Sequence, residues 1–158
     1  MFQVASTPVA RANILLAKFM VVGLWSLLLT VMFFLVSLLL GAAIGLSQGT
    51  AEVFWHGIAT LAVATCLVIV DVFPFAFFAS VGRGYLLPMG VVLLVLMLGN
   101  VVTIAGWGTY FPWAVPALSA GLTGKGKLEA ASYLLVLFTG LAGMAGTYLW
   151  WRFADQNR

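Results

Sequence analysis

Long apolar runs separated by short polar stretches dominate the chain. Apart from Asp71, charged residues lie only near the N-terminus, in three short connections and at the C-terminus. Each uncharged run after Lys18, Arg83 or Glu129 is as long as the roughly 20 residues that a bilayer-spanning helix needs. The pattern therefore predicts an all-α, polytopic membrane protein whose four transmembrane helices cover about residues 19–45, 55–79, 85–106 and 131–151.

The connection at 107–130 differs from the other two, because it combines aromatic residues, prolines and glycines. Pro112 and Pro116 rule out one continuous helix through it. The aromatic side chains could form a belt at the membrane interface. Alternatively, the segment is a short re-entrant or interfacial hairpin before the last span, with its freed backbone groups buried in protein. The aromatic residues in question are Trp107, Tyr110, Phe111 and Trp113.

Two sets of glycines have the spacing of helix-packing residues. Gly41 and Gly45 lie four residues apart near the end of the first span, and Gly140, Gly143 and Gly146 form a stripe along the last one. Small residues at such intervals let two membrane helices approach closely. We therefore expect both sets to lie at helix–helix contacts.

Composition supports the membrane assignment and excludes a soluble domain. Of the 158 residues, 64% are hydrophobic and only 7% are charged, whereas about 25% of a soluble protein is charged. With the N-terminus in the cytoplasm, five flanking basic residues lie inside and two outside, which favours cytoplasmic N- and C-termini. The net charge of +3 then follows from topology and gives no reason to expect a nucleic-acid partner. The inner residues are Arg11, Lys18, Arg83, Arg152 and Arg158, and the outer ones are Lys125 and Lys127.

Reactive side chains are few and scattered. His56 and Cys66 are single, and the four carboxylates fall in different parts of the chain. No paired carboxylates or metal-ligand spacing are present, and the GKGK sequence at 124–127 lacks the spacing of a phosphate-binding loop. We therefore expect no catalytic residue, metal or cofactor, and any ATP hydrolysis would occur on another chain.

Asp71 is the exception to the uncharged spans. A carboxylate facing lipid at the bilayer centre costs roughly 2.5–3.5 kcal/mol, so Asp71 is expected to face the bundle interior. It could form an ion pair with Lys18, it could be protonated, or it could be a polar point on a transport path.

Residues 1–18 form a polar, cationic segment before the first span. Pro8, Arg11 and Lys18 could simply anchor the chain at the inner membrane surface. They could also belong to a short segment that docks a cytoplasmic partner.

Three stretches resemble one known family. They are PVARANILLAK at 8–18, PFAFFASVGRGYLLP at 74–88 and GWGTYFPWAVPAL at 106–118. Together they are similar to the permeases of type-2 ATP-binding-cassette (ABC-2) exporters, and most of all to the bacitracin and lantibiotic resistance branch. The YFPWAVP element at 110–116 is the most specific of these likenesses.

The resemblance implies a transport subunit without enzymatic activity, placed in the bacterial cytoplasmic membrane. It implies a dimer of two permeases, each docking a separate ABC ATPase through the segment that contains Pro8 and Arg11. The substrate would be amphipathic, such as an antimicrobial peptide or a drug. Residues Trp107 to Pro116 would form an outer re-entrant element that shapes the exit.

One departure keeps other functions open. Permeases of this family usually have six spans, and this chain resembles the last four, beginning within the docking loop. A non-transporting scaffold or immunity protein, or an inactive permease fragment, is therefore an alternative, as is a small intramembrane enzyme.

Overall fold

The computed structural model describes residues 11–45, 49–82, 84–123 and 127–153. Within them, four helices are long and apolar enough to cross a membrane. They are α1 (Arg11–Ala43), α2 (Ala51–Val81), α3 (Leu86–Ile104) and α5 (Ala130–Phe153). The described residues form no strand, so the predicted all-α architecture with four spanning helices is confirmed.

Two short 3₁₀ turns and a short helix connect α3 to α5. They are η1 (Gly108–Tyr110), η2 (Pro112–Ala114) and α4 (Val115–Ser119). The turn after α3 requires Gly106, whose φ of 86° lies in the left-handed region that side chains disfavour. The chain therefore reverses at Gly106 and runs back against the bundle instead of extending away from it.

Hydroxyl groups inside the spans are satisfied by their own helices. Thr30, Thr65 and Ser80 each donate a hydrogen bond to the carbonyl four residues earlier, over 2.7–2.9 Å. Such bonds let Ser and Thr sit in an apolar helix without an unsatisfied group. At the start of α2, Thr50 caps the helix by accepting a hydrogen bond from the Val53 amide at 3.4 Å.

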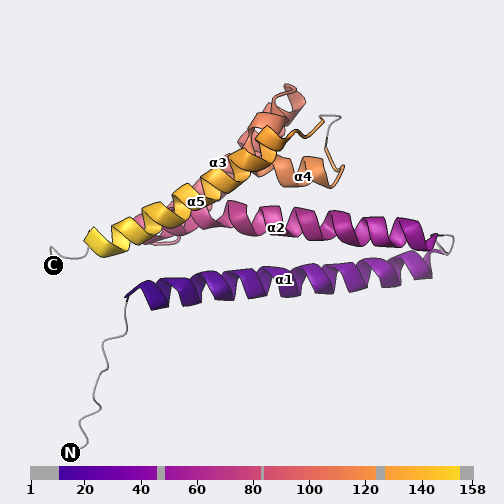
Figure 1. The fold of residues 1–158 in the computed structure, drawn as a ribbon, viewed down its shortest axis with the longest axis horizontal. Helices are drawn as coiled ribbons and strands as arrows, with labels where there is room; N and C mark the ends of the chain where they lie inside the picture. The colour runs from indigo at the N-terminus through magenta and orange to yellow at the C-terminus, as the bar shows by residue number, and fades with distance from the viewer. Residues whose placement is uncertain (1–10, 46–48, 83, 124–126, 154–158) are drawn as a thin grey trace, which may run out of the picture.

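The tightest packing joins α5 to the second half of α2, not to a sequence neighbour. Leu67 of α2, Val115 of α4 and Val136 of α5 form the buried core, the latter two with no exposed surface. As Figure 1 shows, α4 lies beside α2 in the wedge that opens between α2 and α5. The core therefore lies where the α3–α5 connection meets α2.

Helix α1 lies alongside α2 (Figure 1) but makes few contacts with it. Their packing rests on the ring pairs Phe19–Phe73 and Phe34–Phe54, and the hydroxyl oxygens of Thr65 and Thr30 lie 3.4 Å apart. Most large apolar side chains of α1 are exposed, so lipid or another subunit must cover them.

Two sequence expectations differ from the structure. Helix α1 begins at Arg11, eight residues before the predicted span, because residues 11–18 contain no helix breaker. Gly41 and Gly45 bring no helices of this chain together, since a Cβ on either would meet no atom within 4 Å. Gly45 instead has a φ of 77° in the turn that ends α1.

Candidate functional site

The contact between α2 and α5 is built around Pro74. Proline has no amide hydrogen, so the Val70 carbonyl one turn earlier loses its helical donor. Gly140 lies against this carbonyl, and a Cβ on it would be 2.9 Å from the oxygen. One turn further, a Cβ on Gly143 would be 2.5 Å from the Cα and N of Pro74. The backbones of the two helices therefore touch where α2 is weakened.

Asp71 lies on the same buried part of α2 and is only 4% exposed. Neither carboxyl oxygen has a hydrogen-bond partner among the described residues. The ion pair with Lys18 that the sequence suggested is not formed, because the Lys18 ammonium lies over the ring of Trp151 instead. An unpaired buried carboxyl group is energetically unfavourable, so its position requires a functional or structural reason.

The segment between α3 and α5 reaches the main chain of the same aspartate. The indole N–H of Trp113 donates a 3.0 Å hydrogen bond to the backbone carbonyl of Asp71. Its ring also packs against Phe75 of α2, with centroids 5.9 Å apart, and against Phe111 at 5.5 Å. Trp113 therefore ties the α3–α5 connection to the backbone of the residue that carries the unpaired carboxyl group.

We call residues 107–119 the aromatic segment, and its two ends differ in exposure. Trp107 and Tyr110 are each 68% exposed, as aromatic side chains at a membrane interface would be. Ala114, Val115 and Pro116 are buried in the bundle. The aromatic segment thus has an exposed first part and a second part packed in the bundle.

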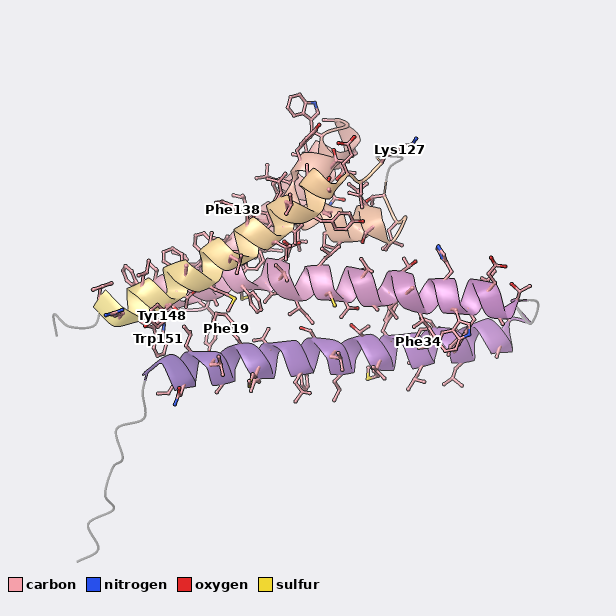
Figure 2. The ribbon with its side chains drawn as sticks, viewed as in Figure 1. Phe19, Phe34, Lys127, Phe138, Tyr148 and Trp151 are labelled. Atoms are coloured by element: carbon pink, nitrogen blue, oxygen red, sulfur yellow. The ribbon has the colours of Figure 1, made fainter. Side chains whose placement is uncertain are left out.

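A cavity of about 1210 Å³ lies at the end of the bundle where α1 starts and α5 ends. Apolar and aromatic side chains of α1, α2 and α5 form most of its wall. Lys18 is its one charged lining residue, with Nζ 4.5 Å from the centre of the Trp151 ring. Phe19 of α1 and Trp151 of α5, both labelled in Figure 2, line this cavity.

The other predicted site residues are dispersed. Pro8 and the side chain of Arg11 lie outside the part of the chain that the structure describes. Gly146 packs against the ring of Phe77, with ordinary contact distances from 3.4 Å. Within the described ranges, no three His, Cys, Asp or Glu side chains lie close enough together to hold a metal ion.

Sequence reasoning identified Asp71 and Trp113 separately but missed that they meet. They are 42 positions apart, and no local spacing connects them. One signal was available: the indole N–H of a packed tryptophan usually finds a hydrogen-bond acceptor, and Pro74 marks a place where the regular hydrogen bonding of α2 is interrupted.

Comparison with known proteins identifies the chain's relatives only at the family level. A family model described as ABC-2 family transporter protein matches residues 1–99, which is more than half of the chain. The match covers α1, α2 and most of α3, and it ends before the aromatic segment. Searches of curated proteins and of solved structures found no match.

Proposed function

The chain belongs to the ABC-2 family of transporter proteins, and we propose that it exports an amphipathic substrate across the bacterial cytoplasmic membrane. As a member of that family with four spanning helices, it is a multi-pass membrane permease of an ABC transporter. The observation that carries the proposal is the family match over residues 1–99. ATP would be hydrolysed by a separate ABC ATPase, and a second permease would complete the membrane pore.

The substrate class follows from the bacitracin and lantibiotic resistance branch that the sequence resembles. Amphipathic antimicrobial peptides or drugs would fit a path with largely apolar walls and few polar points. In this proposal both termini lie in the cytoplasm, since that orientation places most flanking basic residues inside. The aromatic segment then lies toward the outer face and forms part of the exit.

Asp71 has a specific role in this mechanism. Its unpaired, buried carboxyl group raises the free energy of the packed arrangement by about 1–3 kcal/mol. In this proposal, separating the aromatic segment from α2 breaks the Trp113 hydrogen bond to Asp71 and opens the surroundings of the carboxyl group to water. Asp71 therefore lowers the free energy needed to open the path, and ATP binding on the partner subunit drives the opening.

The proposal is tested by co-purification with the ABC ATPases of the source organism. We expect the wild-type chain to retain one of them and Arg11→Glu to lose it, because charge reversal would repel an acidic docking surface. Lys127→Glu makes the same change of charge just before α5, at the other end of that helix from Arg152, and should retain the ATPase. If Arg11→Glu recovers as much ATPase as the wild type, the docking site does not include Arg11. If the wild type recovers no ATPase, the exporter function is contradicted.

A further inference from the structure

The cavity beside Lys18 combines one positive charge with an extended apolar wall. It lies between the first turns of α1 and the last turns of α2 and α5. Phe19, Phe73 and Trp150 contribute aromatic surface to it. Its volume of about 1210 Å³ exceeds the roughly 300–1,000 Å³ of typical small-molecule pockets. The space therefore suits a long apolar chain better than a compact metabolite.

Lys18 is the one charged side chain among the residues that line the cavity, and the hydroxyl groups of the wall already donate to backbone carbonyls. The Trp151 indole N–H donates a 3.0 Å hydrogen bond to the Ser80 hydroxyl, which itself donates to the Ala76 carbonyl. Thr147 donates to the Gly143 carbonyl. Lys18 forms no ion pair with any described residue, and its ammonium group lies over the ring of Trp151. Its ammonium group thus keeps donors for an anion.

The position of Lys18 matches that of a lipid headgroup. Lysine and tryptophan near a helix end occupy the interfacial region, where phospholipid phosphates lie. Lys18 is near the start of α1, and Trp150 and Trp151 are near the end of α5. A molecule with an acidic head at this level and a tail in the cavity would have the geometry of a membrane lipid.

We propose that this cavity binds an anionic phospholipid, with its headgroup at Lys18 and one acyl chain between α1 and α2. The acyl chain is as well solvated by surrounding lipid as by the cavity wall, so burying it gives little preference. Selectivity must therefore come from the charge of Lys18. The inference does not depend on the ATPase or on the transported substrate.

The test measures how strongly the purified chain retains spin-labelled phosphatidylglycerol relative to spin-labelled phosphatidylcholine in mixed vesicles. One basic side chain near a membrane surface favours an anionic lipid by about fivefold. We expect Lys18→Gln to remove that preference and Lys18→Arg to keep it. Arg152→Gln is the matched control, because Arg152 lies at the same end of the bundle but does not line the cavity.

A preference that survives Lys18→Gln, or that Arg152→Gln removes equally, would overturn the proposal in favour of general surface charge. Ala79→Leu provides a second test that leaves Lys18 intact. Ala79 lines the cavity, so a larger side chain there should reduce the immobilised fraction of both lipids. An unchanged fraction would show that no acyl chain occupies the cavity.

Discussion

Replacing Gly143 by alanine is expected to destabilise the chain by about 1–3 kcal/mol, the range for forcing extra atoms into a packed interior. The added Cβ would lie 2.5 Å from the Cα and N of Pro74, and backbone atoms cannot move aside as a flexible side chain can. The loss should appear although alanine is intrinsically favoured over glycine in helices by about 1 kcal/mol. Gly143→Leu should leave little folded protein.

The measurement is the unfolding midpoint in detergent micelles, with two alanine variants as controls. A Cβ on Gly146 makes only ordinary contact with Phe77, and a Cβ on Gly90 meets nothing within 4 Å. Gly146→Ala and Gly90→Ala should therefore be as stable as the wild type or slightly more so. If Gly143→Ala behaves like these controls, α5 does not pack on Pro74 in the folded protein.

Replacing Asp71 by valine is expected to stabilise the chain and impair its function. Valine fills much of the same volume without an unpaired polar group, so stability should rise by about 1–3 kcal/mol. The gain of about 1–3 kcal/mol in the packed state would also have to be overcome when the aromatic segment opens. The population of the open state should therefore fall by about 5- to 150-fold. ATP hydrolysis by the complex in proteoliposomes should fall accordingly, while the unfolding midpoint rises.

Asp71→Asn is the control for Asp71→Val, because it removes the acidic group but keeps a polar side chain. It preserves the size of the side chain and its unpaired polar atoms, so its stability should stay close to that of the wild type. A loss of stability in Asp71→Val would show that the carboxyl group has a favourable partner in the membrane. That result would contradict the role of Asp71 in favouring opening.

The spans could be predicted because their signal is local. Uncharged runs before Glu52 and Arg152 are fixed by the cost of charge in lipid, whatever the helices pack against. The same local reasoning detected the glycine stripe of α5 but not its partner. The sites of contact with Val70 and Pro74 depend on how helices distant in sequence meet, and no spacing encodes that.

Two interpretations of the sequence find no matching contact among the described residues, for a shared physical reason. Opposite charges make Lys18 one possible partner of Asp71, but the ring of Trp151 offers Lys18 an attractive face nearer the interface. Gly41 was expected to pack because its spacing with Gly45 is correct, but α1 makes few contacts within this chain. Spacing identifies residues that allow close approach and does not establish that a neighbour is present.

ATP-driven opening of an exit beside Asp71 is tested most directly by labelling a cysteine introduced at Ala114. Ala114 is 4% exposed within the aromatic segment, and Cys66→Ser removes the chain's single cysteine. An impermeant maleimide is added outside vesicles that hold the complex, with and without internal ATP. Thr123→Cys serves as the control that should react in both conditions.

We predict that Ala114→Cys is protected without ATP and reacts during ATP turnover, and that Asp71→Val suppresses this reaction. If Ala114→Cys stays protected with ATP while Thr123→Cys reacts, the aromatic segment does not open during the cycle. The proposed export path beside Asp71 would then be contradicted.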